Sequence, residues 1–349
     1  MSDLASLDTP VPVIDLDIVE RNLVRMQNYA NAHGIALRPH IKTHKLPAFA
    51  KRAVELGAVG ITCQKLGEAE VMAAAGLDDI LISYPLVGAA KARRLVALTA
   101  LATMRVAIDN PVALATLAQA ARDAKAPIGV LVEFDSGQKR TGVVSVAEAL
   151  TLIAQVKETP GLRFDGLMTY RSTPATASFI QAVKDAGVDL PIVSGGGTPG
   201  WDHTHEVAGL TEMRVGTYIY NDRMMVEAGA ATLDDCALHV FATVISRPEE
   251  NRAVIDCGSK TLSSDPMPGG KIPGFGLILD YPDAIIERLT EEHGMVDLSQ
   301  CEDKPKIGDR LQILPNHVCV VTNLHNDVVV SRGGLVEGVW PVAARGLTR

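Results

Sequence analysis

The densest group of reactive side chains in the sequence is the run Arg38-Pro39-His40-Ile41-Lys42-Thr43-His44-Lys45. It directly follows a strand-like segment and brings lysine, histidine and arginine side chains together. Such a cluster is compatible with a solvated basic loop. That is the usual case for a charge cluster. The cluster is also compatible with a lysine whose amine is kept neutral by neighbouring cations and by burial, and a neutral amine can form a Schiff base. Both interpretations stay open on the cluster alone.

Two later segments have glycines in positions typical of ligand-binding loops. The loop from Glu133 to Gly142 has a polar stretch between two glycines, although an ordinary loop between a strand and a helix has the same composition. The segment from Ser194 to Pro199 contains three consecutive glycines, which let backbone N–H groups approach an anion, and Thr198 adds a hydroxyl. No Gly-Lys-Ser/Thr follows these glycines, so we predict a phosphate site without nucleoside triphosphate chemistry.

A third feature is the pair His317 and Cys319, in the segment Pro315-Asn316-His317-Val318-Cys319. On a strand these two side chains would point to the same face, and an imidazole with a thiolate can bind a divalent ion such as Zn²⁺. Two ligands suit an open, catalytic site. The alternative is a half-buried histidine beside a core cysteine. We also note His293, in Glu291-Glu292-His293-Gly294, as a candidate base or outer-sphere residue.

The elements that must position these residues alternate regularly between about residues 35 and 220. Short β-branched runs are followed by Ala/Leu-rich runs with helical periodicity, which indicates parallel βαβ units. Eight such strands favour a closed (β/α)8 barrel, and the irregular last helices leave a doubly wound sheet as the alternative. The predicted strands are Leu37–Ile41, Gly60–Gln64, Asp79–Ser83, Met104–Ile108, Ile128–Glu133, Phe164–Thr169, Pro191–Ser194 and Glu212–Thr217.

After about Asp235 the pattern changes to strand-like runs separated by turn residues, including one from Arg310 to Leu324. This indicates a second, β-rich domain. A strand-like run near the start, from Thr9 to Val19, joins either the β-rich sheet or the barrel. We therefore predict an α/β fold with a barrel over residues 18–232 and a β-rich domain from residues 1–17 plus 233–349.

Composition narrows the function classes. The chain has 349 residues, with 33 Lys and Arg against 41 Asp and Glu, so its net charge of −8 does not favour nucleic acid or an anionic membrane surface. No run of apolar residues is long enough for a membrane span, and the acidic start lacks a signal-peptide pattern. Five cysteines suit thiols in a reducing cytoplasm, so we expect a cytoplasmic protein.

Taken together, these motifs resemble the fold-type III pyridoxal-phosphate enzymes. The chain is similar to the D-threonine aldolase and D-serine dehydratase family, whose barrel is shared with alanine racemase. The similarity rests on the Arg-Pro-His-x-Lys-x-His-Lys run, on Cys63-Gln64-Lys65 and on Glu292-His293-Gly294. It also includes the Gly-Gln-x-Arg-x-Gly loop from Gly137 to Gly142 and the segment Gly195-Gly196-Gly197-Thr198.

The resemblance implies a role for each motif. Lys42, and not Lys45, would hold pyridoxal phosphate as an imine, and a divalent metal would bind beside the cofactor at His317 and Cys319. It also implies a homodimer and a small D-amino acid as substrate. Residues implied around the pyridoxal ring are Gln64, Arg140 and Tyr170, and those implied around the phosphate are Gly196, Gly197, Thr198, Gly216, Thr217 and Tyr218.

The chain departs from the family pattern in two places. Family aldolases carry Tyr-His-Gly where this chain has Tyr170-Arg171-Ser172, close to the expected substrate position. The metal pair of well-known D-threonine aldolases is His-x-Asp, whereas His-x-Cys is associated with D-serine dehydratase. Thiolate favours zinc, and carboxylate favours harder ions such as Mn²⁺ or Mg²⁺.

The resemblance predicts a lyase that cleaves D-threonine-like β-hydroxy-α-amino acids to glycine and an aldehyde. The same residues could serve a dehydratase that forms a 2-oxo acid and ammonia. A non-catalytic pyridoxal-phosphate carrier and a simple metal-binding module are further alternatives. The β-rich domain and the metal pair weigh against the carrier, and Lys42 with the glycine loops weighs against the module.

Overall fold

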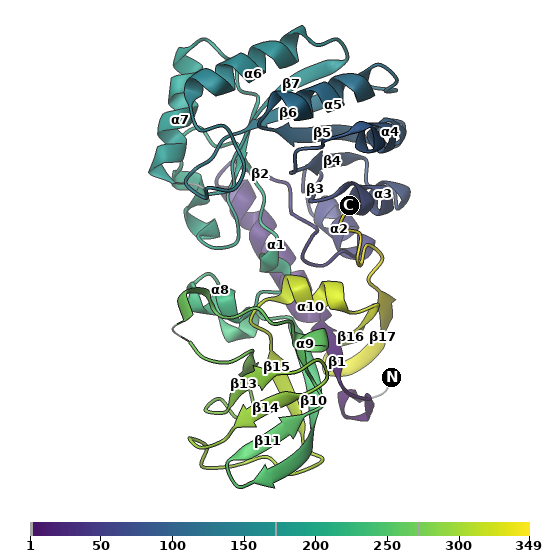
Figure 1. Cartoon of the computed structure of the whole chain (residues 1–349), viewed down its shortest axis with the longest axis vertical. Helices are drawn as coiled ribbons and strands as arrows, with labels where there is room; N and C mark the ends of the chain where they lie inside the picture. Colours follow the sequence, from purple (N-terminus) through teal and green to yellow (C-terminus); the bar gives the residue numbers. More distant parts are fainter. Residues whose placement is uncertain (1–2, 172, 271) are drawn as a thin grey trace. The chain divides into compact units, whose positions relative to one another are not determined.

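The computed structural model describes residues 3–171, 173–270 and 272–349. Its contacts divide the chain into two compact units, both drawn in Figure 1. The barrel unit contains Arg25–Lys42, Leu46–Gly216 and Leu347–Arg349, and the β-rich unit contains Met1–Val24, Thr43–Lys45 and Thr217–Gly346. Among the described residues, no helix has both the length and the apolar character needed to cross a bilayer.

The barrel unit is built on eight strands that pair in parallel, as the sequence predicted. The sheet runs in the order β2-β9-β8-β7-β6-β5-β4-β3, so each strand from β3 to β8 lies next to its successor in the chain. The strands are β2 (Ala36–Leu37), β3 (Ile61–Cys63), β4 (Asp79–Ile82), β5 (Thr103–Ile108), β6 (Ile128–Glu133), β7 (Leu162–Met168), β8 (Ile192–Gly195) and β9 (Glu212–Met213).

The two ends of this sheet meet through the backbone that follows β2. His40 and Thr62 form an isolated parallel bridge, in which Thr62 N donates to Pro39 O at 2.8 Å and Ile41 N donates to Thr62 O at 2.9 Å. The predicted closed barrel is therefore confirmed, and the doubly wound alternative is wrong. This bridge also places the run that contains Lys42 directly after a barrel strand.

Helices lie outside the strands of this sheet in Figure 1. Local capping defines several of their starts: Asn110 accepts from Ala113 N, and Ser145 and Glu148 form a reciprocal capping box. These helices are α2 (Pro47–Glu55), α3 (Leu66–Ala74), α4 (Ala89–Leu98), α5 (Pro111–Ala121), α6 (Val146–Glu158) and α7 (Pro174–Asp185), with a 3₁₀ turn at Trp201–Glu206. Helix α1 (Leu16–Ala32) precedes β2 and has its first residues in the β-rich unit.

Ion pairs occupy the barrel interior near the starts of its strands. Arg38 Nε lies 2.8 Å from Glu212, and Arg38 Nη1 lies 2.5 Å from Asp79. Arg105 contacts both Asp79, at 2.6 Å, and Asp165, at 2.8 Å. Because Asp79 begins β4 and Glu212 begins β9, these charges neutralise one another at the amino ends of the strands, and the opposite ends remain for chemistry.

The β-rich unit is a mixed nine-stranded sheet with short helices around it. Its main path runs β13-β14-β11-β10-β1-β16-β17, and β15 pairs with both β10 and β12. The N-terminal strand β1 (Val11–Asp15) joins this sheet, which resolves the alternative left open by the sequence. The other strands are β10 (Leu238–Glu249), β11 (Arg252–Ile255), β12 (Leu277–Ile278), β13 (Ile285–Leu289), β14 (Gly294–Asp297), β15 (Arg310–Leu314), β16 (Asp327–Arg332) and β17 (Leu335–Pro341).

The single strand predicted from Arg310 to Leu324 is wrong in its second half. Strand β15 ends at Leu314, and helix α10 (Val318–Leu324) follows with His317 at its N-cap. The carboxylate of Asp222 accepts from Val318 N at 3.1 Å and so caps the helix from a distant part of the chain. The other short helices of this unit are α8 (Arg223–Glu227) and α9 (Ser259–Leu262).

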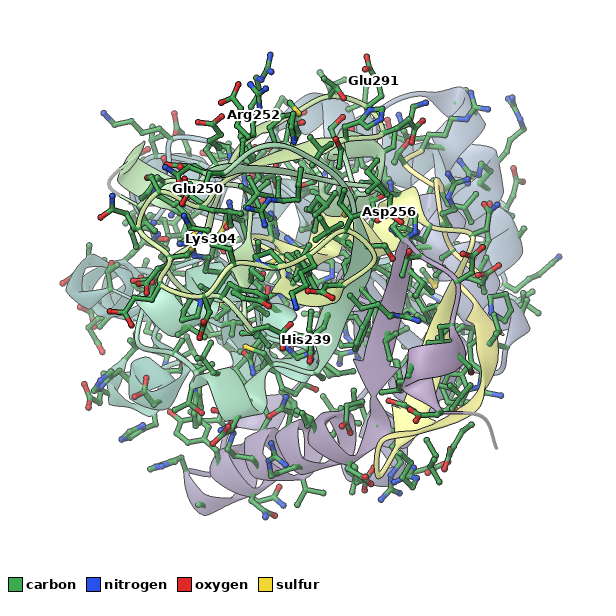
Figure 2. All side chains as sticks on the ribbon, turned by 90° about the horizontal axis from the view of Figure 1, so that it is seen from below. His239, Glu250, Arg252, Asp256, Glu291 and Lys304 are labelled. Carbon is green, nitrogen blue, oxygen red and sulfur yellow. The ribbon has the colours of Figure 1, made fainter. Side chains whose placement is uncertain are left out.

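His239, labelled in Figure 2, is a buried titratable group of this sheet. It lies on β10 opposite Val13 of β1, and burial lowers the pKa of its imidazole to about 4, although nearby Asp15 acts in the opposite direction. The unfolded chain binds this proton at about pH 6.5, so the folded state is destabilised as the pH falls from about 6.5 towards 4.

We therefore expect His239→Gln to reduce the acid sensitivity of folding. Between pH 7 and pH 5, a pKa near 4 in the folded state contributes about 2 kcal/mol to the loss of unfolding free energy. The wild-type protein should show this loss in urea titrations at the two pH values, and His239→Gln should lose about 2 kcal/mol less. Equal losses in the two proteins would contradict the prediction.

Candidate active site

Lys42 lies in a turn directly after the bridge that joins the ends of the barrel sheet. Its backbone N–H donates to His40 Nδ1 at 3.3 Å, and the other ring nitrogen of His40 lies 3.1 Å from Gln64 Oε1 and 3.3 Å from Ser83 Oγ. The Lys42 side chain is half-buried, and among the described residues its amine has no hydrogen-bond or ion-pair partner. Predicted residues Lys42 and Gln64 are thus linked through His40, and sequence analysis missed the role of Ser83.

A second cluster surrounds the triple glycine. Gly196 has a φ of +77°, and a Cβ added at Gly197 would lie 3.3 Å from Cε2 of Tyr170, so a side chain there would press against this ring. The guanidinium of Arg140 lies 5.0 Å from the centre of the same ring. Predicted residues Arg140, Tyr170, Gly196 and Gly197 therefore form one group.

Tyr170, Gly196 and Gly197 of this group border a cavity of about 350 Å³. The buried Thr198 continues the glycine run and completes the predicted phosphate segment on this side. Ser172, part of the departure from the family pattern, lies outside the described residues. The cavity is lined by Tyr170, Arg171, Thr173, Gly196, Gly197, Pro199, Gly200, His203 and Thr204.

Sequence analysis missed a buried cation at the ends of the same strands. The Arg214 guanidinium donates to Ser194 Oγ at 2.8 Å and to Thr169 O at 2.7 Å, and Ser194 Oγ in turn donates to Glu212 at 2.6 Å. Burial lowers the pKa of Arg214 to about 10, against the opposing charges of Glu212 and Glu133. The signal available in the sequence was a charged residue just after the last barrel strand.

Glu133 adds a buried acid at the end of β6. Its Oε1 accepts from Thr141 Oγ1 at 2.9 Å, whereas its Oε2 has no hydrogen-bond partner among the described residues. Burial raises the pKa of this carboxyl group, and the hydrogen bond from Thr141 and the charges of Arg214 and Arg140 partly offset that effect. The carboxyl ends of the barrel strands therefore hold buried polar groups, as a polar ligand requires.

In the β-rich unit, the His317 and Cys319 side chains do come together, but at the start of helix α10 and not on a strand. The two form a hydrogen bond, and His317 Nδ1 also lies 2.8 Å from Asp265 Oδ2. Burial lowers the pKa of the His317 imidazole. The contacts with Cys319 and the carboxylates of Asp222 and Asp265 outweigh this effect and raise the pKa to about 9. A metal ion that binds His317 must therefore displace a proton from its imidazole ring.

Two hydroxyl groups contact the sulfur of Cys319. Thr43 Oγ1 lies 3.2 Å from Sγ, and Thr217 Oγ1 lies 3.9 Å from it. Thr43 is the residue after Lys42, and Thr217 is itself one of the predicted phosphate residues. The neighbouring Tyr218 is buried, which raises the pKa of its phenol.

His293 lies elsewhere in the β-rich unit, in the exposed turn between β13 and β14. Its ring nitrogen Nδ1 is 3.5 Å from Thr290 Oγ1, and its carbonyl accepts from Thr290 N at 2.9 Å. No contact among the described residues joins His293 to His317 or Cys319. Its role as a catalytic base stays a prediction.

The residues at these positions fit both the cofactor and the divalent metal that the motifs imply. The unpartnered amine of Lys42 and the glycine cradle suit an aldehyde cofactor that carries a phosphate. Imidazole and thiolate are ligands for a borderline-soft divalent ion. In the part of the chain that the structure describes, no group of three or more His, Cys, Asp or Glu side chains is arranged to hold a metal, so water or substrate would complete the coordination.

Comparisons with known proteins show the family and the fold of this chain. The model for the N-terminal domain of alanine racemase matches residues 14–224, and the model for a putative serine dehydratase domain matches residues 237–331. A D-threonine aldolase from Arthrobacter sp. is 36% identical, over 99% of this chain and 95% of that protein. The crystal structure of a D-threonine aldolase from Filomicrobium marinum has a TM-score of 0.89 at 36% identity and covers 99% of this chain and 98% of that one.

A dehydratase is also similar to this chain. The structure of D-threo-3-hydroxyaspartate dehydratase from Delftia sp. HT23 has a TM-score of 0.85 at 29% identity, over 98% of this chain and 99% of that one. A Cys-to-Ala mutant of a D-threo-3-hydroxyaspartate dehydratase has been solved in a metal-free form, with a TM-score of 0.84 at 29% identity over the same shares of the two chains. The chain therefore belongs to the pyridoxal-phosphate-dependent lyases of the D-threonine aldolase and D-serine dehydratase family, on the alanine racemase fold.

Proposed function

We propose that this protein cleaves D-β-hydroxy-α-amino acids of the D-threonine type by a retro-aldol reaction, with pyridoxal phosphate and a divalent metal. The observation that carries the proposal is the contact between Thr43 and Cys319 at 3.2 Å. Because Thr43 is bonded to Lys42, the segment that supplies the amine also supplies an outer contact of the metal pair. An amine for the cofactor and a metal for the β-hydroxyl are the two requirements of this cleavage.

The cofactor has its own set of residues. Pyridoxal phosphate, when bound, supplies an electron sink for the bond that breaks at Cα. Lys42 would hold it covalently, and the backbone N–H groups of Gly196 and Gly197, with the Thr198 hydroxyl, would bind its phosphate. The same role is proposed for the backbone of Gly216 and the hydroxyls of Thr217 and Tyr218. Arg140, Tyr170 and Gln64 would orient the ring.

The metal is proposed at His317 and Cys319, with zinc as the preferred ion because thiolate is a soft ligand. A divalent ion, when bound, acts as a Lewis acid on the substrate β-hydroxyl. Support comes from the contact between the two side chains and from the metal-free form of the dehydratase cysteine variant. Mn²⁺ and Mg²⁺ are the alternative ions.

Protein groups must then move two protons. A base, for which His293 is our candidate, accepts the proton of the substrate β-hydroxyl as the Cα–Cβ bond breaks and the aldehyde forms. Lys42 Nζ, released when the substrate takes its place, returns a proton to Cα and completes glycine. The substrate loses one proton at oxygen and gains one at carbon, so the reaction needs no oxidant or reductant.

Dehydration is the second candidate function, and the His-x-Cys pair favours it. In this route Lys42 Nζ would accept the Cα proton, and a divalent ion held by His317 and Cys319 would supply the Lewis acid that assists loss of the β-hydroxyl. The product hydrolyses to a 2-oxo acid and ammonia. The two routes diverge at Cα: cleavage breaks the Cα–Cβ bond and keeps the β-oxygen in the aldehyde, whereas dehydration breaks Cα–H and then the Cβ–O bond.

Product analysis with D-threonine separates the candidates. We expect acetaldehyde and glycine in equal amounts from the holoenzyme, measured by an alcohol dehydrogenase assay and amino acid chromatography. 2-Oxobutyrate and ammonia would instead identify a dehydratase. Cofactor binding without turnover of D-threonine, D-serine or D-threo-3-hydroxyaspartate would contradict both and indicate a carrier. The family resemblance further supports a homodimer, which light scattering of the purified protein can test.

A further inference from the structure

His317 has an anionic partner that the sequence motifs did not reveal. Asp265 Oδ2 lies 2.8 Å from His317 Nδ1, and both side chains are only partly exposed, at 38% and 33%. A carboxylate can only accept a hydrogen bond, so Nδ1 must carry the hydrogen and Nε2 is left as the nitrogen that can bind an ion. The contact therefore determines which face of the imidazole is available.

The loop that carries Asp265 is tied to the backbone beside His317. Asn316, the preceding residue, is almost fully buried, and its Nδ2 donates to Asp265 O at 3.0 Å and to Gly274 O at 2.9 Å. Asp265 N donates in turn to Ser263 Oγ at 3.2 Å. These bonds fix the backbone of Asp265 beside His317. The carboxylate therefore starts from a fixed position when it contacts the imidazole.

The sulfur of the pair is supported in the same way. Thr43 and Thr217 hydroxyls lie 3.2 Å and 3.9 Å from Cys319 Sγ, where they can donate to a thiolate. Each of the two ligating side chains therefore has an outer hydrogen-bond partner, His317 at Nδ1 and Cys319 at its sulfur. Outer partners of this kind fix the orientation of a ligand and raise its basicity.

We propose that Asp265 is a positioning residue for the metal: its carboxylate holds His317 with Nε2 free, and it sets the affinity of the His317/Cys319 pair for zinc. This inference rests on the proposed function, since it concerns the metal of that site. It adds a residue that neither the motif nor the spacing of the pair indicates. Removal of such a partner typically weakens metal binding about 10- to 100-fold.

The test is zinc affinity of the purified protein, measured by chelator competition. Asp265→Ala is expected to bind zinc about 10- to 100-fold more weakly than wild type, and Asp265→Asn, whose amide oxygen can still accept from Nδ1, less so. Asp283→Asn changes an exposed carboxylate of the same unit and should match wild type. Thermal unfolding of each metal-free variant controls for a general loss of stability.

A second readout reports the contact itself. With histidines labelled with ¹⁵N and zinc at saturation, the Nδ1–H signal of His317 should be downfield and protected from exchange in wild type, and lost in Asp265→Ala. Zinc affinity of Asp265→Ala within about twofold of wild type, or an unchanged Nδ1–H signal, would overturn the inference alone. A wild-type protein that binds no zinc would overturn the metal part of the proposed function together with it.

Discussion

Lys42→Ala is expected to abolish both covalent attachment of pyridoxal phosphate and lyase turnover. The amine is the group that would hold the cofactor and then return a proton to Cα, so its removal affects two steps, and we expect activity to fall by at least about a thousandfold. Attachment is measured by borohydride reduction followed by peptide mass spectrometry, and turnover by aldehyde release from D-threonine. The visible absorbance of bound cofactor should be lost together with the cross-link.

Lys45→Ala is the informative control because it changes the second lysine of the same run. The Lys45 amine is buried and donates to Ala344 O at 3.4 Å, a structural contact within the β-rich unit. This variant should lose stability but keep the reducible link to the cofactor. Lys51→Ala, an exposed lysine on α2, should behave as wild type. A mass-tagged peptide that contains Lys45 in place of Lys42 would remove Lys42 from its role.

The order of the eight barrel strands could be predicted because apolar runs alternate with helical segments, although the first and last strands, β2 and β9, are only two residues long and so shorter than predicted. Strand β6, for example, is buried along its whole length and begins and ends where the sequence placed it. Parallel strands covered on both faces are continuous apolar runs, which a single sequence displays clearly. The catalytic motifs were recognisable for a related reason: in a barrel they follow strand ends, so their position in the chain indicates their place in the fold.

Helix α10 could not be predicted because its capping group is far away in the chain. The run from Val318 to Leu324 is rich in β-branched residues, which favour a strand locally. The buried residues Val318, Val321 and Thr322 have the spacing of a helix face, but so short a run is ambiguous. The carboxylate of Asp222, almost a hundred positions earlier, decides between the two by accepting from Val318 N.

The same limit applies to the site. His317 and Cys319 could be paired from their spacing, although the strand geometry used to pair them was wrong. Asp265 could not be found, because nothing local distinguishes it from other charged residues, and the only signal for Arg214 was its place at the last barrel strand. Their roles depend on burial and on contacts between distant segments, which only the folded chain supplies.

Cys319→Ala is expected to release the proposed zinc ion and to lower turnover by at least about a hundredfold. A Lewis acid at the β-hydroxyl lowers the activation barrier by several kcal/mol, and the variant would lose this effect. Zinc content is measured by mass spectrometry of the dialysed protein, and activity before and after EDTA. Cys301→Ala provides the control, since Cys301 is also a partly exposed thiol of the β-rich unit. Retained activity in Cys319→Ala, or in chelator-treated wild type, would contradict a metal at this pair.

Cys319→Asp tests the identity of the metal more directly, because it converts His-x-Cys into His-x-Asp without removing a ligand. Carboxylate oxygen is a harder donor than thiolate sulfur, so the variant should bind zinc more weakly and regain activity preferentially with Mn²⁺ or Mg²⁺. The Thr43 and Thr217 hydroxyls that contact the sulfur can donate equally to a carboxylate, which keeps the new ligand oriented. If the ligand also selects the bond that breaks, the ratio of acetaldehyde to 2-oxobutyrate from D-threonine should rise in this variant. An unchanged ratio with a changed metal preference would show that Cys319 selects the ion and that the choice of bond lies with other residues of the site.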